Sequence, residues 1–198
     1  HRCDEGLRLL GVPTSENARQ LALAYGTPRT GLELGQPIDL VIDGADEVDP
    51  ELNLIKGGGG ALLREKIVAA AAKQVVIIVD HAKLVPVLGR FHLPVEFVPF
   101  GQGVVARALT HYGVAMSLRA ENGEGPFVTD EGNHIYDLAF DTIEDPCGLA
   151  RELDSIVGVV EHGLFIDMAD RVIVGHGEHA DTLWPDVSSK PALPRTPR

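Results

Sequence analysis

The fold is decided by residues 38–80, which read IDLVIDGADEVDPELNLIKGGGGALLREKIVAAAAKQVVIIVD. Two apolar runs within this stretch, residues 38–43 and 75–79, each lead into an aspartate and have the pattern of buried strands. Between them, four glycines open an alanine-rich segment over residues 61–73, which predicts a helix. A strand, a helix and a second strand in this order predict a parallel sheet covered by helices.

The flanking segments extend this layer. Residues 1–11 look like the end of a helix that runs into a strand, and because residue 1 is not Met, we expect the chain to begin partway through a longer sequence. Residues 17–25 follow the start signal Thr14-Ser15-Glu16 and predict a capped helix. Residues 171–174 are expected to return the chain to the first sheet.

From about residue 93 the pattern changes to shorter elements. Strands are predicted over residues 95–98, 114–118, 127–129, 134–139 and 157–165, and helices over residues 104–112 and 146–156. The order β-α-β-β-α-β, with a hairpin turn at residues 130–133, is that of a ferredoxin-like lobe.

Together these patterns predict an α/β fold in which a Rossmann-like parallel sheet layer carries a smaller ferredoxin-like α+β lobe. We expect residues 1–89 and 168–184 to form the main layer and residues 90–167 to form the lobe. The proline-rich residues 185–198 are expected to be a disordered tail.

Composition limits the class of function. The chain has 198 residues, with 17 Lys+Arg against 29 Asp+Glu, a formal net charge of −12. This acidic balance, with only 5% aromatic residues, argues against a nucleic-acid surface. No apolar run approaches the roughly 20 residues that span a bilayer, no signal pattern opens the chain, and two cysteines make no disulfide framework. We expect a cytoplasmic protein that binds a small molecule, with neither nucleic acid nor membrane as a partner.

Candidate chemistry begins where the first strand ends. In open α/β sheets, ligands bind beyond the carboxyl ends of the strands, and Asp43 stands at such an end, with Asp46 close behind. Gly44 and Ala45 leave room for a ligand against the backbone. An Asp-Gly pair is also a common turn signal, so this block alone does not distinguish a site from a turn.

The lysine and glycines that follow favour a site. Lys56 precedes Gly57, Gly58 and Gly59 and a fourth glycine, which permit close backbone approach at the start of a helix, where N–H groups attract anions. A flexible linker is the alternative, although linkers rarely run straight into a strong helix. No Ser or Thr follows a Gly-Lys pair, so this is not a Walker loop, and a cradle for an enolate-like or hydroxyl oxygen fits better.

Glu65 is the candidate base. Its neighbours at helical spacing are Ala61, Leu62 and Ala69, which place it on an apolar face where desolvation raises the pKa of a carboxyl group. The alternative is that residues 64–66 form a solvated, charged face. A carboxylate base beside a cationic cradle is suited to abstracting a proton next to a carbonyl group.

Residues 43–47 and 56–66 closely resemble the signature of the type A ribose-5-phosphate isomerase family. The resemblance extends from about Gly11 to Gly175 and includes residues 12–15, 79–85 and 163–165. It implies an aldose–ketose isomerase that interconverts ribose 5-phosphate and ribulose 5-phosphate through an enediolate. It also implies a sugar phosphate as the ligand, no metal or organic cofactor, and assembly as a homodimer or homotetramer.

The resemblance also implies roles for individual residues. Glu65 moves the proton between C2 and C1, while Asp43, Asp46 and Lys56 contact the sugar hydroxyls, assist ring opening and steady the enediolate. Which aspartate handles ring opening stays open. The glycines at residues 57–59 line the substrate, and Lys83 also binds it.

One departure and several alternatives accompany this reading. The family's Gly-Thr-Gly-Ser-Thr-like phosphate loop does not occur before Gly11, so we expect weak binding of the sugar phosphate, which calorimetry with ribose 5-phosphate measures.

A non-catalytic sugar-phosphate sensor and an acyl-CoA-handling relative are rival functions. Residues 101–106 match a dinucleotide fingerprint, but the strand before them carries Pro94 and Glu96 and is unlike a central parallel strand. The histidines have no metal-ligand spacing.

Overall fold

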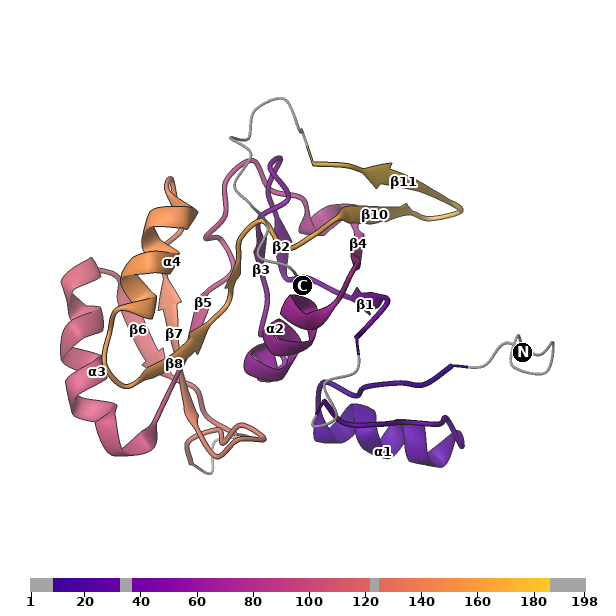
Figure 1. The fold of residues 1–198 in the computed structure, drawn as a ribbon. Coiled ribbons are helices and arrows are strands. Elements are labelled where there is room, and N and C mark those ends of the chain that lie inside the picture. The colour runs from indigo at the N-terminus through magenta and orange to yellow at the C-terminus, as the bar shows by residue number, and fades with distance from the viewer. Residues whose placement is uncertain (1–8, 33–36, 122–124, 186–198) are drawn as a thin grey trace.

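The computed structural model describes residues 9–32, 37–121 and 125–185 (Figure 1). The α-helices in these ranges are α1 (Glu16–Ala24), α2 (Leu62–Ala71), α3 (Gln102–Leu109) and α4 (Pro146–Asp154). Short 3₁₀ turns are η2 (His81–Lys83), η3 (Pro99–Gly101) and η4 (Thr110–Tyr112). Within the same ranges the strands form three sheets.

The first sheet has the strand order β1-β4-β10-β11. Its strands are β1 (Val41–Asp43), β4 (Val75–Asp80), β10 (Arg171–His176) and β11 (His179–Leu183). β4 pairs in parallel with both β1 and β10, which confirms the predicted parallel layer and the return of the chain to it. The first predicted strand is shorter than expected because Ile38 makes only an isolated bridge, to Ala72. The antiparallel β11 was not predicted, since its exposed, polar residues lack a strand pattern.

Helix α2 covers one face of this sheet. Val68 and Ala69 of α2 are buried against Val41 and Ile77 of the strands in one hydrophobic cluster. The predicted helix over residues 61–73 is confirmed in its position, with ends one or two residues shorter. The N-terminal turn of α2 lies near the carboxyl end of β1, because Lys56 contacts both Asp43 at the end of β1 and Glu65 in the first turn of α2.

The third sheet forms the ferredoxin-like lobe. It has the order β6-β7-β5-β8, all antiparallel, built from β5 (Leu93–Phe97), β6 (Ala115–Leu118), β7 (His134–Ala139) and β8 (Val159–His162). Helices α3 and α4 lie on one side of it (Figure 1). Asp145 caps α4 by accepting a hydrogen bond from the N–H group of Gly148, and Pro146 occupies the first turn. The predicted lobe topology is confirmed.

Two strand predictions in the lobe are wrong. Residues 127–129 are not a strand: β7 pairs directly with β6, and the Thr129 N–H group bonds instead to the Asn133 carbonyl to close a turn. The single strand predicted over residues 157–165 is divided at Gly163. A Cβ atom there would overlap the carbonyl oxygen of Lys56, so the backbone approaches another segment too closely for any other residue.

The division at Gly163 creates the second sheet, which the sequence did not predict. Its strands are β2 (Glu47–Val48), β3 (Leu54–Ile55) and β9 (Leu164–Phe165), with β3 in the middle. Apolar side chains gather in two clusters, one at the parallel sheet and one in the lobe. The domain boundaries at residues 90 and 167 stay predictions, and residues 1–8 and 186–198 lie outside the described residues.

Candidate active site

A buried lysine forms the centre of the site. The Nζ atom of Lys56 lies 3.0 Å from a carboxylate oxygen of Asp43, 3.0 Å from a carboxylate oxygen of Glu65 and 2.7 Å from the carbonyl oxygen of Gly44, to which it donates a hydrogen bond. The lysine side chain is 5% exposed, while those of Asp43 and Glu65 remain 24% and 17% exposed. The ammonium group is therefore held inside the protein, together with the Glu65 carboxylate oxygen that it contacts, while the Asp43 and Glu65 side chains as a whole stay partly exposed.

Three elements position these groups. Asp43 is the last residue of β1, Lys56 follows β3 directly, and Glu65 stands in the first turn of α2. The Asp43 carboxylate also accepts a hydrogen bond of 2.8 Å from the N–H group of Gly44, which fixes its orientation at the strand end. The location beyond the carboxyl end of a parallel strand is where the sequence predicted it.

Asp46 is connected to the site through the glycine loop. Its carboxylate accepts a hydrogen bond of 2.8 Å from the N–H group of Gly58, and a Cβ atom on Gly58 would lie 2.9 Å from that carboxylate. The carbonyl groups of Gly57 and Gly58 accept hydrogen bonds from the guanidinium of Arg119, which is also paired with Asp137. The loop is therefore held from both sides by charged side chains.

This arrangement corrects part of the predicted anion cradle. The N–H group of Gly58 is taken by Asp46, and the N–H group of Gly60 donates to the carbonyl oxygen of Gly57 across a turn. Two of the backbone donors that the sequence suggested for a ligand are thus used within the protein. The positive group that faces the carboxylates is Lys56 itself.

The surroundings of Glu65 shift its pKa in the direction that favours a general base. Burial raises the pKa of its carboxyl group above the ordinary value, the Lys56 ammonium opposes this, and the negative charge of Asp43 adds to it. A solvated face over residues 64–66 is excluded, because Arg64 pairs with Asp130 and Glu131 while Lys66 pairs with Glu161. Of the three residues, Glu65 alone turns toward Lys56.

Lys83 reaches a cavity beside this cluster rather than the cluster itself. A cavity of about 460 Å³ is lined by Lys83, Ala45 and residues of β4 and β10, including Asp80 and Gly175. A second cavity, of about 380 Å³, has Gly58, Arg90 and Arg119 among its lining residues. Ala45 and Gly58, two of the predicted binding residues, therefore each line one of these two cavities.

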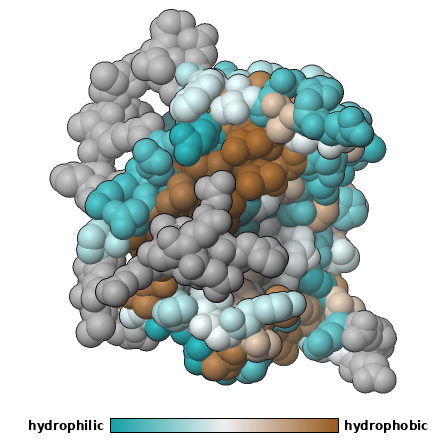
Figure 2. All heavy atoms as spheres, turned by 90° about the vertical axis from the view of Figure 1, so that its right-hand side faces the viewer, coloured by the Kyte–Doolittle hydropathy of each residue, from teal (hydrophilic) through white to brown (hydrophobic). Residues whose placement is uncertain are grey.

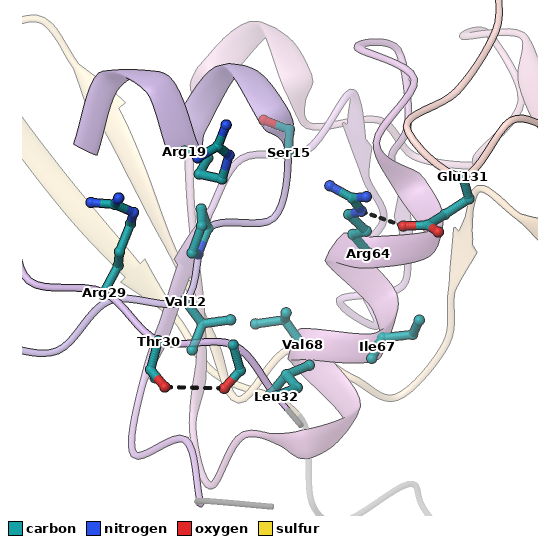
Figure 3. A pocket seen from close by; sticks show the side chains of 12 residues that line it. Val12, Ser15, Arg19, Arg29, Thr30, Leu32, Arg64, Ile67, Val68 and Glu131 are labelled. Atoms are coloured by element: carbon teal, nitrogen blue, oxygen red, sulfur yellow. Dashed lines mark hydrogen bonds and ion pairs between the residues drawn. The ribbon is translucent and has the colours of Figure 1, made fainter. Parts of the chain in front are cut away.

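A third cavity, of about 540 Å³, was missed by the sequence reasoning. It lies between the segment around α1 and helix α2, and Figure 3 shows Val12, Leu32 and Val68 meeting on one side of it. Arg19, Arg29 and Arg64 contribute positive side chains from three separate segments. Nothing in the sequence marked these arginines as neighbours, because residues 19, 29 and 64 come together only through the packing of α1 near α2.

The fold and the site define an acid–base enzyme: a half-buried carboxylate with a raised pKa lies beside a buried lysine and an aspartate at the edge of a parallel sheet. Residues 10–179 match the family described as ribose 5-phosphate isomerase A (phosphoriboisomerase A). The chain belongs to the ribose-5-phosphate isomerase A family, whose members interconvert ribose 5-phosphate and ribulose 5-phosphate.

Individual relatives agree with this assignment. The ribose-5-phosphate isomerase A of Parvibaculum lavamentivorans is 50% identical over 184 residues, which cover 90% of this chain and 80% of the relative. The solved structure of ribose 5-phosphate isomerase A from Methanocaldococcus jannaschii has a TM-score of 0.87 at 41% identity and covers 92% of this chain and 81% of its own. A solved D-ribose-5-phosphate isomerase in complex with phospho-erythronic acid has a TM-score of 0.88 at 41% identity, covering 92% and 82%.

These findings bear on the rival functions. They support the isomerase and give no support to the sugar-phosphate sensor. The dinucleotide fingerprint at residues 101–106 follows β5, an antiparallel strand inside the lobe, and not a strand of a parallel βαβ unit.

None of the helices in the described ranges is long and apolar enough to cross a bilayer.

Proposed function

We propose that Glu65 is the base that moves the proton between C2 and C1 during the isomerisation of ribose 5-phosphate. The observation that carries this proposal is the 3.0 Å contact between its carboxylate and the Lys56 ammonium, in a position where burial raises the pKa of Glu65. A carboxyl group with a pKa closer to neutrality is both ionised at neutral pH and able to return the proton.

The electron flow follows from this pair. The carboxylate of Glu65 takes the proton from C2, the C2–H electron pair forms the C1–C2 double bond, and the carbonyl electrons move to O1. The negative oxygen of the enediolate is stabilised by the ammonium of Lys56, a charge already held in place before reaction. Transfer of the proton from O2 to O1, and return of the proton from Glu65 to C1 as the C2=O2 double bond forms, give the ketose. The enzyme's own side chains supply every group in this scheme.

The aspartates prepare the substrate. We assign ring opening, which begins with removal of the proton from the anomeric hydroxyl group, to Asp43 or Asp46. Asp43 is held by Lys56 and its carboxylate remains partly exposed, while Asp46 is held by the N–H group of Gly58. The backbone of residues 57–59 and of Gly44 and Ala45 is then expected to lie along the sugar.

Lys83 is proposed to bind the phosphate end. It stands in the cavity that Ala45 also lines, and an ammonium group there concentrates positive potential in a chain whose net charge is −12. One of the solved relatives is in complex with phospho-erythronic acid, a sugar-acid phosphate, which supports a phosphate-bearing sugar as the ligand.

The wider setting is also a proposal. The reaction belongs to the non-oxidative pentose phosphate pathway, and we propose that the enzyme works in the cytoplasm, since two cysteines provide no disulfide framework. We propose further that it assembles as a homodimer or homotetramer. The sugar phosphate is its expected partner, without nucleic acid or membrane.

The variant Glu65→Gln tests the assignment of the base. Turnover in a coupled assay is expected to fall by about 10²- to 10⁴-fold, the contribution typical of a general base. In D₂O the native enzyme should introduce deuterium at C1 of the product, and the variant should not. Binding of ribose 5-phosphate should persist in calorimetry, because the aspartates and Lys83 are unchanged.

The matched control is Glu152→Gln, on an exposed position of α4. It makes the same chemical change far from the site and should retain native turnover and exchange. Normal turnover in Glu65→Gln would exclude Glu65 as the base.

A further inference from the structure

Three consecutive residues of α2 point in three directions. Arg64 pairs with Asp130 and Glu131, Glu65 faces Lys56, and Lys66 pairs with Glu161 of β8. Successive side chains on an α-helix are about 100° apart, so three neighbours can contact three different surfaces. The rotation of α2 about its axis is therefore set by contacts on both sides of the proposed base.

The contact made by Lys66 is the more buried of the two. Its ammonium donates a 2.7 Å hydrogen bond to the carbonyl oxygen of His162 in addition to pairing with Glu161. The Lys66 side chain is 14% exposed, against 34% for Arg64. The acid–base scheme above does not use this buried cation.

Phe165 connects Lys66 to the active site. The Lys66 Nζ atom lies 4.9 Å from the centre of the Phe165 ring, and the Lys56 Nζ atom lies 5.4 Å from the same ring. The two ammonium groups thus share one buried aromatic side chain, an arrangement in which each is attracted to the ring. A shift of Lys66 would change the packing that also holds Lys56.

The backbone reinforces this connection. The N–H group of Lys56 donates a 2.9 Å hydrogen bond to the carbonyl oxygen of Gly163, where the absence of a side chain allows the two segments to meet. Residues 161–165 therefore hold Lys56 through the backbone and Lys66 through its side chain. They therefore help to fix the positions of both the segment that carries Lys56 and helix α2, which carries Glu65.

The side chains near Lys66 that could hold a metal ion, Asp154, Glu161 and His162, already have a positive charge beside them. The side chains of Asp154, Glu161 and His162 place ligand atoms within 4.8 Å of one another, but the Lys66 ammonium already supplies a positive charge there. Burial and the charge of Lys66 lower the pKa of His162 to about 4, so its ring is neutral at neutral pH. Its Nδ1 atom accepts from the N–H group of Leu164, which leaves Nε2 to donate to Asp154 at 3.2 Å.

We propose that Lys66 is a positioning residue for the isomerisation, which locks α2 against residues 161–165 so that the Glu65 carboxylate stays in contact with Lys56. This inference rests on the proposed role of Glu65 as the base. Lys66 touches neither substrate nor the reacting atoms in this scheme. Its effect is transmitted through the orientation of the helix and through the shared ring of Phe165.

The proposal predicts a specific kinetic signature. Lys66 pairs with Glu161 and the His162 carbonyl group and not with Asp43, Asp46 or Lys83, so substrate binding should change much less than the alignment of the base. The base, in contrast, should lose its alignment, and misplacement by about 1 Å can cost about 100-fold in rate. The loss should therefore fall on kcat and not on KM.

The pH profile supplies a second signature. Lys56, Asp43 and Asp46 are the charged groups that act on Glu65, and only Lys56 lowers its pKa. If the contact with Lys56 loosens, the pKa of Glu65 rises. The acid limb of the kcat/KM profile should then move to higher pH, which a simple loss of folded protein would not cause.

The test compares Lys66→Met, Lys66→Arg and the control Lys73→Met. Lys73 pairs with Asp39 at an exposed position beyond the end of α2, so its variant removes a lysine from the same region without touching residues 161–165. We expect Lys66→Met to lower kcat at least about 10-fold, with KM within about 3-fold and the acid limb moved upward. Lys66→Arg should restore most of kcat, and Lys73→Met should behave as the native enzyme.

Two outcomes overturn the proposal: native kcat in folded Lys66→Met, or a reduced kcat with an acid limb that does not move. If Lys66→Met does not fold, Glu161→Gln carries the test, because it removes the partner charge at constant shape and should shift kcat and the acid limb in the same directions by less. Failure of these variants leaves the Glu65→Gln result intact, whereas an active Glu65→Gln would remove the base itself. The two experiments therefore distinguish a wrong positioning residue from a wrong base.

Discussion

At the scale of single residues, the site depends on one buried positive charge shared by two carboxylates. Lys56 is 4% exposed and contacts both Asp43 and Glu65 at 3.0 Å. Removing one member of a buried ion pair typically costs about 3–5 kcal/mol, because the remaining charge stays desolvated. Lys56 therefore stabilises the folded site, and because the proposed scheme also assigns it to the enediolate, its loss is expected to affect both stability and turnover.

The raised pKa of Glu65 leads to a pH prediction. Because the base must be ionised, activity is lost as pH falls through the pKa of Glu65, which burial places above the ordinary value of 4.5. The acid limb of the kcat/KM profile should lie above 4.5, and it should move to still higher pH in Lys56→Met, where the group that lowers this pKa is gone. Rate measurements across pH 4 to 8 check this, and an acid limb at or below the ordinary glutamate value would contradict it.

At the scale of elements, the glycine loop determines how α2 enters the site. Gly57 and Gly60 have φ values of +100° and +81°, which only glycine adopts without strain. The ring of Phe127 lies against Gly60, in the space where a Cβ atom would be. The loop thus turns sharply between β3 and α2, and it brings Lys56 and Glu65 together although eight residues lie between them in the sequence.

This geometry separates two neighbouring glycines by their effect on stability. Gly60→Ala combines a positive φ with overlap on Phe127 and should destabilise the protein by about 2 kcal/mol or more. Gly59→Ala has no atom within 4 Å of the new Cβ atom and should change the free energy of unfolding by less than about 0.5 kcal/mol. Urea denaturation of both variants measures the difference, and equal midpoints would contradict the assigned loop geometry.

At the scale of the whole molecule, the described residues cover only one face of the parallel sheet. Helix α2 packs on the inner face, while Ile42 and Ile78 on the strands β1 and β4 are 62% and 49% exposed. Figure 2 shows apolar side chains gathered on the side of the molecule where this sheet lies. Parallel sheets normally bury both faces, so we expect this face to be covered in the assembled protein, in the proposed assembly by a second copy.

The proposed homodimer or homotetramer is tested by the mass of the protein in solution. Light scattering after size-exclusion chromatography should give two or four times the chain mass of 21.2 kDa. On dilution the measured mass should fall only at low protein concentration, because a large apolar interface holds the subunits together tightly. A single-chain mass at all concentrations would refute the proposed assembly.

The sequence by itself determined the class of the fold and the composition of the site. Buried strands ending in acids and a glycine-headed helix are local patterns, and they predicted the parallel layer, α2 and the lobe topology. The same patterns identified Asp43, Lys56 and Glu65, because each stands at the end or beginning of an element whose direction is set by the chain order.

Only the tertiary structure decided how these parts meet. The division of the last lobe strand at Gly163, the sheet of β2, β3 and β9, and the contact of Lys66 with residues 161–165 all join segments about 100 residues apart. Such contacts arise from close packing of backbones and desolvation of charges between distant segments, which leave no periodic pattern in either one. The sequence therefore named Glu65 as the proposed base, and the packing of α2 against the lobe determined which groups Glu65 contacts.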